Sequence, residues 1–472
     1  MSRPSPDRPP RIGQLSVYFG LFDEAMPPEF RRDREALAHR FTEFLSAGGD
    51  VVYPGVVDSE EAGRRANRVF AAEEVEVVVF VPAMAAPPSY GWEAISGLDV
   101  PVISVAAQEL TSIPDVYTTE EGTQRSTLVG LVMFTNVMAR EGRPMVTLVG
   151  RLESAEFAAE VAETVRAAAL ANRLKGSRVG AIGAPIGGYL DVEATPDEVA
   201  RLGLQMVSIS REELNAAFVE ASAEGVKGLA DGLRDRFETS RTSDEILHRS
   251  ARLALALQDI CQRNGLAGGT VNCHGDMFRW NPEVGITACL GVTCLTEAGT
   301  PLSCTGDLPA GIALVIGKAV AGGSLYCEVY GVDFEGDWVL LANGGESDVS
   351  MADPTRPITL VPEDHYMGVG GPGTAIVFSL PTGPATLLSM SPIAGAEGGW
   401  ALVVGEGEII GSRHEAIEGP NGMFRFSSGP APEAFQRFCN AGATHHSVLT
   451  PGHNLRTLQL MAEWMGFEVR AV

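Results

Sequence analysis

Short apolar runs alternate with longer stretches of helical periodicity over the first third of the chain. Residues 75–81 are apolar apart from Glu76, which is typical of a strand buried on both faces. The predicted strands cover residues 12–19, 51–53, 75–81, 100–105 and 146–149, and the predicted helices cover residues 30–47, 59–72 and 153–174. This alternation predicts a doubly wound parallel sheet.

The same alternation restarts after Lys175, where we place a domain boundary. Strands are predicted at residues 179–183 and 205–208, helices at 211–221 and 243–261, and further apolar runs at 291–295 and 312–320. We therefore expect a second doubly wound, flavodoxin-like domain. No G-x-G-x-x-G follows the first strand of the chain, so the pattern does not support a dinucleotide cofactor.

Period-two alternation replaces helical runs after Gly322, and glycine and proline interrupt the chain every few residues. Predicted strands cover residues 338–341, 374–380, 386–390, 400–405 and 467–469, with one helix at 455–465. This pattern favours a mainly antiparallel, barrel-like domain. The expected architecture is thus two doubly wound domains, 11–174 and 175–322, followed by a β-rich domain, 323–472, with a disordered tail at 1–10.

The length of 472 residues fits two to four domains. The formal net charge of −25 limits the classes of molecule that the protein can bind. A strongly negative surface repels phosphate backbones and anionic lipids, so we expect neither nucleic acid nor membrane as a partner. The proline-rich tail has no apolar segment, and no run of 18 apolar residues exists, which predicts a cytoplasmic protein. Seven cysteines without a C-x-x-C pair indicate buried free thiols.

Two carboxylates flank the apolar helix predicted at residues 312–320. Asp307 lies in a small-residue turn before it, and Glu328 lies in a short strand after it. Acids brought together from the two ends of one helix can bind a divalent metal. The alternative is that Asp307 is a helix N-cap and Glu328 an ordinary surface residue.

Histidines supply the remaining candidate ligands. His445 and His446 are adjacent in a small-residue loop before a helix, so we expect their imidazoles to point to different sides, one into a site and one supporting it. A capping or solvent role is the alternative. His274 could line the same site or be a satisfied buried histidine, and Glu283 or Glu297 could add a carboxylate.

Several motifs resemble the L-arabinose isomerase and L-fucose isomerase family. The segment from Gly442 to Val448 resembles the Gly-Gly-Ala-His-His-Thr-Val segment of arabinose isomerases, in which the second histidine binds manganese. Tyr326 to Tyr330 resembles the Phe-Met-Glu-Asp-Tyr metal-ligand strand, and Gly383 to Leu388 resembles Gly-Pro-Val-Thr-Leu-Leu. These matches occur in the family's order.

The same comparison reveals departures from the family. Thr305 stands where arabinose isomerases carry their first catalytic glutamate, although Cys304 to Asp307 otherwise resembles that segment. Asn343 lies near the position of a histidine ligand, and residues 20–23 do not match the glutamine-containing loop after the first strand. Fucose isomerases have an aspartate at the position of Asp307.

The resemblance implies a Mn²⁺-dependent aldose–ketose isomerase that acts on an open-chain pentose, hexose or deoxysugar through an enediol. Asp307, Glu328 and His446 would bind the metal, with Asp307 or Glu328 as the base. His274, Thr305, Asn343 and His445 are the expected substrate-binding residues. The family also implies a homotrimer or homohexamer with the active site between subunits. Two alternatives stay open: another enediol-type reaction, such as epimerisation or carbon–carbon cleavage, and a non-catalytic sugar-binding protein.

Overall fold

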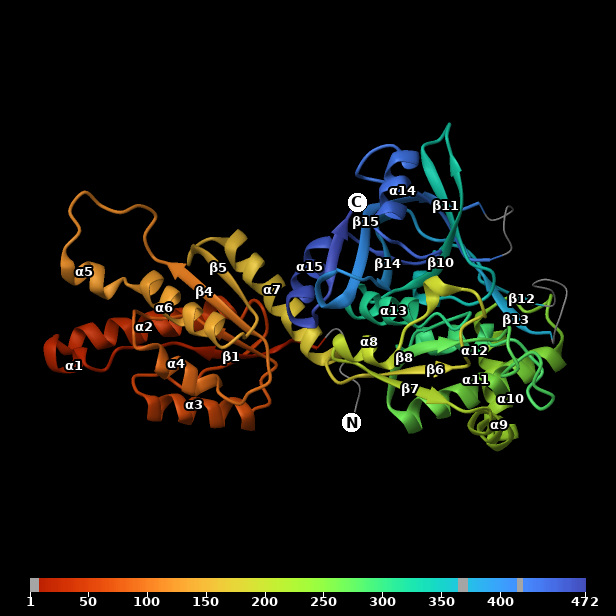
Figure 1. Ribbon diagram of the computed structural model, residues 1–472, viewed down its shortest axis with the longest axis horizontal. Coiled ribbons are helices and arrows are strands. Elements are labelled where there is room, and N and C mark those ends of the chain that lie inside the picture. The colour runs from red at the N-terminus through yellow and green to blue at the C-terminus, as the bar shows by residue number, and fades with distance from the viewer. Residues whose placement is uncertain (1–7, 364–371, 414–418) are drawn as a thin grey trace. The chain divides into compact units, whose positions relative to one another are not determined.

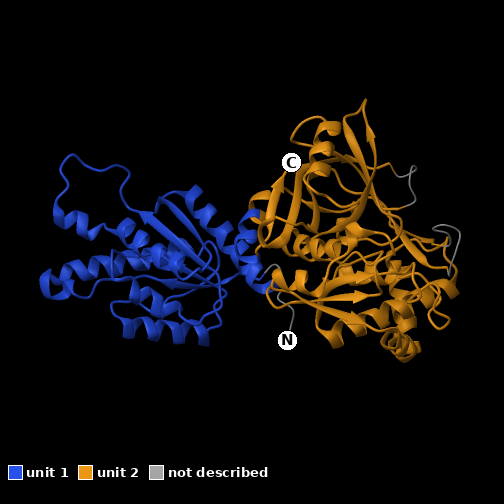
Figure 2. Ribbon diagram, in the orientation of Figure 1, with its two compact units in different colours: residues 1–174, 459–465 blue, residues 175–458, 466–472 orange. Residues whose placement is uncertain are grey.

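The structure is a computed structural model that describes residues 8–363, 372–413 and 419–472. Residues 1–7 of the predicted tail lie outside this range. The chain divides into two units (Figure 2), the first made of residues 1–174 and 459–465 and the second of residues 175–458 and 466–472. The predicted boundary at residue 322 falls within the second unit and stays a prediction.

Five parallel strands form the described sheet of the first unit, in the order β2-β1-β3-β4-β5. This is the strand order of flavodoxin-like folds. The strands are β1 (Arg11–Leu15), β2 (Asp50–Val52), β3 (Val77–Phe80), β4 (Val102–Gln108) and β5 (Met145–Arg151). The helices are α1 (Phe22–Ala25), α2 (Pro28–Leu45), α3 (Glu60–Ala72), α4 (Pro88–Ile95), α5 (Thr119–Gln124), α6 (Thr127–Arg140) and α7 (Ala155–Leu174).

Alternate side chains of β3 belong to two separate hydrophobic cores. Val77 and Val79 pack with α2 and α7 on one face of the sheet, whereas Val78 and Phe80 pack with α3, α4 and α6 on the other. Because helices cover both faces, the strand is apolar at every position. The doubly wound architecture expected for this part of the chain is therefore confirmed.

The second unit contains a parallel sheet with the order β7-β6-β8-β9. Its strands are β6 (Arg178–Ile182), β7 (Gln205–Ile209), β8 (Leu266–Val271) and β9 (Leu302–Ser303). Its helices are α8 (Pro196–Arg201), α9 (Arg211–Glu220), α10 (Ala223–Arg236), α11 (Asp244–Asn264), α12 (Cys289–Glu297) and α13 (Leu308–Ala321), and the 3₁₀ helix η1 covers Leu190–Val192.

The hydrophobic pattern does not predict β8, because glycines interrupt it. A Cβ atom at Gly269 would lie 2.1 Å from the carbonyl oxygen of Gly180 on the neighbouring strand β6. Only glycine permits this close approach of two strands. The strand thus forms through backbone pairing, although its sequence lacks a strand-like run.

A mainly antiparallel sheet forms the rest of the second unit, with the order β14-β17-β10-β11-β16-β15-β18, in which β18 pairs with β15 in parallel. An additional pairing of β14 with β15 closes six of the described strands into a ring, as the barrel-like prediction required. The strands are β10 (Leu325–Asp333), β11 (Trp338–Ala342), β14 (Gly383–Pro392), β15 (Trp400–Gly411), β16 (Asn421–Phe426), β17 (His446–Pro451) and β18 (Glu468–Ala471), and β12 (Thr359–Pro362) pairs separately with β13 (Thr374–Val377). Helices α14 (Ala431–Asn440) and α15 (Leu455–Met465) complete the fold.

Helix α13 lies between the second parallel sheet and the closed antiparallel sheet (Figure 1). It contacts β8 on one side and β14 and β17 on the other. A helix enclosed in this way is apolar around nearly its whole circumference, which explains why its sequence is apolar apart from Lys318. Its N-terminus therefore meets the end of β9 and the start of β17, where the candidate ligands lie.

Candidate metal centre

The turn between β9 and α13 fixes the position of Asp307. Thr305 and Gly306 both have positive φ angles, 59° and 79°, which reverse the chain within two residues. Such a conformation is uncommon for a β-branched residue and is found at turns and functional sites. A Cβ atom at Gly306 would lie 2.5 Å from the Cα of Pro185, so glycine is required there.

Asp307 is the N-cap of α13 and is completely buried. Its Oδ1 accepts a hydrogen bond from the backbone N–H of Ala310 at 2.8 Å, and its Oδ2 lies 2.7 Å from Nδ1 of His446. Burial raises the pKa of Asp307, and the hydrogen bond from His446 opposes this effect. Both carboxylate oxygens are thus engaged within the protein.

Glu328 and His446 are direct partners across the β10–β17 ladder. Opposed residues of antiparallel strands have their side chains close together on one face. The metal-ligand atoms of Glu328, His446 and His445 all lie within 4.8 Å of one another. The structure therefore brings Glu328 and His446 together as predicted, but the third member of the group is His445, and Asp307 lies behind His446.

His445 points to the same side as His446, contrary to the sequence-based expectation. The centroids of the two imidazole rings are only 3.8 Å apart. Because His445 lies in a bend before β17 begins, the alternation of side chains along a strand does not apply to it. The two histidines form one donor pair.

A second carboxylate, Asp191 of η1, holds His445. Its Oδ2 lies 2.5 Å from Nδ1 of His445 and accepts the backbone N–H of the same residue at 3.2 Å. Burial alone would raise the pKa of Asp191, but these hydrogen bonds hold it below its usual range. Sequence reasoning did not identify Asp191, although it follows β6 at the end of the sheet where ligands usually bind.

Each histidine therefore has Nδ1 bonded to a carboxylate, the buried Asp307 or the exposed Asp191, which leaves Nε2 for a ligand. Metal-binding histidines are commonly oriented by a carboxylate in this way. Two imidazole nitrogens and one carboxylate oxygen suit Mn²⁺, Fe²⁺ or Zn²⁺ better than Ca²⁺. The donor set fits a divalent transition metal.

Aromatic side chains surround the three donors. The ring of Tyr326 lies 4.6 Å from that of His446, and the hydroxyl of Tyr330 donates to Oε2 of Glu328 at 2.6 Å. Thr305 approaches from β9, with its Oγ1 3.4 Å from the hydroxyl of Tyr326. These contacts leave Glu328 half-buried, so a small molecule can reach it.

The other predicted residues lie outside the three-donor group. Asn343 is buried in the segment that follows β11. Its side-chain amide donates a hydrogen bond to the carbonyl oxygen of Glu346 at 2.9 Å. His274 belongs to a separate group with two cysteines. Glu297 forms an ion pair with Arg236, and Glu283 is not part of either group.

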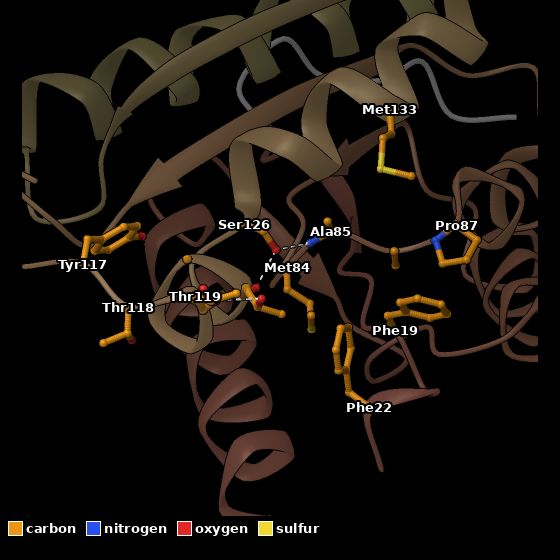
Figure 3. A pocket seen from close by; sticks show the side chains of 13 residues that line it. Phe19, Phe22, Met84, Ala85, Pro87, Tyr117, Thr118, Thr119, Ser126 and Met133 are labelled. Atoms are coloured by element: carbon orange, nitrogen blue, oxygen red, sulfur yellow. Dashed lines mark hydrogen bonds between the residues drawn. The ribbon is translucent and has the colours of Figure 1, made fainter. Parts of the chain in front are cut away.

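A pocket of about 630 Å³ lies in the first unit, at the carboxyl ends of its strands (Figure 3). Phe19, Phe22 and Met84 supply its apolar wall, and Tyr117 lies across from them. Ser126 fixes one side by accepting the backbone N–H of Ala85 at 3.0 Å. Ligands of open α/β sheets bind at this edge, and here the lining is mainly apolar.

The C-terminal residues have a recognisable relative. Residues 323–468 match the family model of the L-arabinose isomerase C-terminal domain. The match includes Glu328, His445 and His446, and it supports a sugar isomerase. The resemblance to arabinose isomerases is confirmed over these residues, whereas the resemblance to fucose isomerases stays a prediction.

Other comparisons add little. No curated protein matches the chain. A solved ABC transporter solute-binding protein from Burkholderia multivorans is 13% identical, with 66% of this chain and 92% of that chain covered, at a TM-score of 0.16. A likeness of this size carries no argument. No helix among the described residues combines the length and apolar character needed to cross a membrane.

Proposed function

We propose that this protein is a metal-dependent aldose–ketose isomerase for an open-chain pentose, hexose or deoxysugar. The observation that carries the proposal is the convergence of Glu328, His445 and His446 within 4.8 Å. All three residues belong to the segment that matches the arabinose isomerase domain. Convergent donors within a matching domain favour isomerisation over sugar binding alone.

Glu328 and the Nε2 atoms of His445 and His446 would hold the metal, with Mn²⁺ as the expected ion. When bound, the ion would supply Lewis-acid stabilisation of negative charge on the sugar oxygens O1 and O2. Asp307 and Asp191 keep the two imidazoles in one tautomer and one orientation. Asp307 is thus a positioning residue in this proposal, because neither of its oxygens is free.

Glu328 is also the carboxylate that a sugar can reach. It would remove the proton from C2 of the aldose and return it to C1, while a hydroxyl proton passes from O2 to O1. The hydrogen bond from Tyr330 to Oε2 fixes the orientation of the carboxylate, whose two oxygens would be shared between the ion and the proton. Positioned acid–base groups of this kind contribute about 10²–10⁴-fold to a rate.

The test is incubation of the Mn²⁺-loaded protein in D₂O with pentoses, hexoses and deoxysugars. We expect a ketose product and deuterium in the sugar, both lost with a chelator and restored by Mn²⁺. Neither ketose nor deuterium with any aldose would contradict isomerisation. Sugar binding without metal and without turnover would instead identify a sugar-binding protein.

A different enediol reaction is the second candidate, because Thr305 offers a hydroxyl where arabinose isomerases have a carboxylate. A threonine hydroxyl cannot act as a general acid or base at neutral pH as a carboxylate does. Its Oγ1 also donates to the carbonyl oxygen of Cys304 at 2.7 Å. An epimer or a shortened product in the same D₂O experiment, with no ketose, would favour epimerisation or carbon–carbon cleavage.

We also propose a homotrimer or homohexamer, with the active site completed by a neighbouring subunit. Helix α6 supports this because Val129 and Val132 are 56% and 66% exposed there, next to Leu128 and Met133. An exposed apolar group of this kind often marks an interface. A cytoplasmic location stays a prediction.

Replacing Val129 and Val132 together by glutamate is expected to dissociate the assembly, because buried unpaired charge is costly at an interface. Sedimentation velocity measures the change in mass. The same substitution at Val219, which is 68% exposed on α9, is the matched control and leaves the mass unchanged. An unchanged mass in the double variant would rule out α6 as the interface.

A further inference from the structure

Buried thiols meet at the carboxyl ends of β8 and β9, in a group that shares no residue with the three donors described above. Cys273 follows β8 and Cys304 follows β9, and these strands are neighbours in the parallel sheet. The two Sγ atoms lie 3.6 Å apart. Both side chains are buried, and neither forms a disulfide.

His274 completes the cluster. One of its ring nitrogens and the Sγ atoms of Cys273 and Cys304 all lie within 4.8 Å of one another. Asn272 shapes this loop, because its side chain donates to the carbonyl oxygen of Ala184 at 2.6 Å and accepts the backbone N–H of His274 at 3.0 Å. His274 is only partly buried, which gives a small ion a route to the thiols.

The sulfur separation fits a metal better than a disulfide. Thiolates on tetrahedral zinc, with Zn–S bonds of about 2.3 Å, are about 3.8 Å apart. A disulfide bond requires about 2.05 Å. The observed 3.6 Å is close to the first value, so little movement would be needed for two sulfurs to bind one cation.

We infer that Cys273, His274 and Cys304 form a second cation site, for Zn²⁺ or another thiophilic divalent ion of the first transition row. Each coordinated thiol releases its proton to solvent, and no group changes oxidation state. Water fills the remaining position. Soft sulfur donors distinguish this site from the oxygen- and nitrogen-rich group at Glu328, so it does not depend on the proposed isomerase activity.

The surroundings favour positive charge at this site. Cys289, a further buried cysteine, is hydrogen-bonded to Cys273. Glu346 is completely buried nearby, and its Oε1 has no hydrogen-bond partner among the described residues. Burial, and then the charge of Cys273, raise the pKa of Glu346 to about 8. Glu346 is therefore mostly protonated at neutral pH, and a cation beside it would favour its ionised form.

The site would also steady the candidate metal centre. Cys304 immediately precedes the turn that holds Asp307, and Cys273 lies on the adjacent strand end. A cation that joins them would restrain this turn and, through Asp307, the imidazole of His446. The second ion is therefore a structural support for the first.

The test uses the full chain, reduced and freed of metal, titrated with Co²⁺ and then with Zn²⁺. We expect sulfur-to-cobalt charge-transfer absorption with the intensity of one thiolate-bound ion per chain, which disappears when Zn²⁺ displaces Co²⁺. Cys273→Ser and Cys304→Ser should abolish this absorption and weaken Zn²⁺ binding by at least about 100-fold. Cys439→Ser, at an exposed cysteine outside the cluster, and Glu328→Gln should retain it.

A second measurement uses the unaltered protein, so that it tests the inference even if the cysteine variants do not fold. Bound Zn²⁺ should protect Cys273 and Cys304 of the unaltered protein from alkylation, as mapped on peptides, and leave Cys439 reactive. Absence of both the absorption and the protection would overturn the inference. A disulfide between Cys273 and Cys304 in protein that binds no cation would also overturn it and would identify a redox pair.

Discussion

Replacement of Glu328 by glutamine is expected to lower the isomerisation rate at least about 1000-fold and to weaken Mn²⁺ binding. Glutamine keeps the size of the side chain but removes the charge that binds the ion and the base that moves the proton. The fold should persist, because Glu328 is half-buried and its described side-chain hydrogen bond is to Tyr330. Initial rates and metal content, measured on the same preparation, check both effects.

Glu335→Gln is the matched control, because Glu335 is exposed in the turn between β10 and β11. Its rate and metal content should equal those of the unaltered protein. If Glu328→Gln retains both metal and activity, the assignment of Glu328 is wrong.

His445→Gln decides which residue is the third ligand. If His445 binds the ion, this variant should lose Mn²⁺ as Glu328→Gln does, and Asp191→Asn should weaken binding by about 10–100-fold through the orientation of the ring. If Asp307 binds the ion instead, as the sequence suggests, His445→Gln should retain Mn²⁺.

Gly306→Ala is expected to destabilise the second unit by about 3 kcal/mol or more. The added methyl group would lie 2.5 Å from the Cα and 2.7 Å from the backbone nitrogen of Pro185, and backbone atoms cannot move aside without shifting the strand end. The positive φ angle adds a further free-energy cost for alanine, because its Cβ atom lies too close to the backbone in this conformation. Urea unfolding, with hydrogen exchange of the amides of β9 and α13 as the probe, measures the loss of unfolding free energy.

Gly299→Ala separates the two causes, because Gly299 has nearly the same φ angle, 84°, but nothing within 4 Å of its Cβ position. It should lose only about 1 kcal/mol from backbone strain. Equal losses in the two variants would mean that the contact with Pro185 is unimportant. A larger loss at Gly306, together with weaker Mn²⁺ binding, would link the turn to the orientation of Asp307.

Hydrophobic periodicity was sufficient to predict both doubly wound sheets and the closed antiparallel sheet, because each face of an element must be buried by its neighbours. It fails at β8, where Gly268 and Gly269 remove the pattern and the strand depends on close backbone pairing with β6. Strand β17 is also missed, although it carries His446, because its small and polar residues resemble a loop. In such segments the strand conformation depends on hydrogen bonding to neighbouring strands, and the sequence of the segment alone does not predict it.

The sequence by itself determined the identity of the chemical groups: Glu328 in a short strand, His446 in a small-residue loop, and Asp307 before an apolar helix. Only the tertiary structure decided their roles. It bonds both oxygens of Asp307 to other groups, turns His445 beside His446, and brings Asp191 from 254 positions away to hold it. The physical reason is that hydrogen-bond direction and side-chain orientation depend on how β9, α13 and the β10–β17 ladder pack together, which local pattern does not encode.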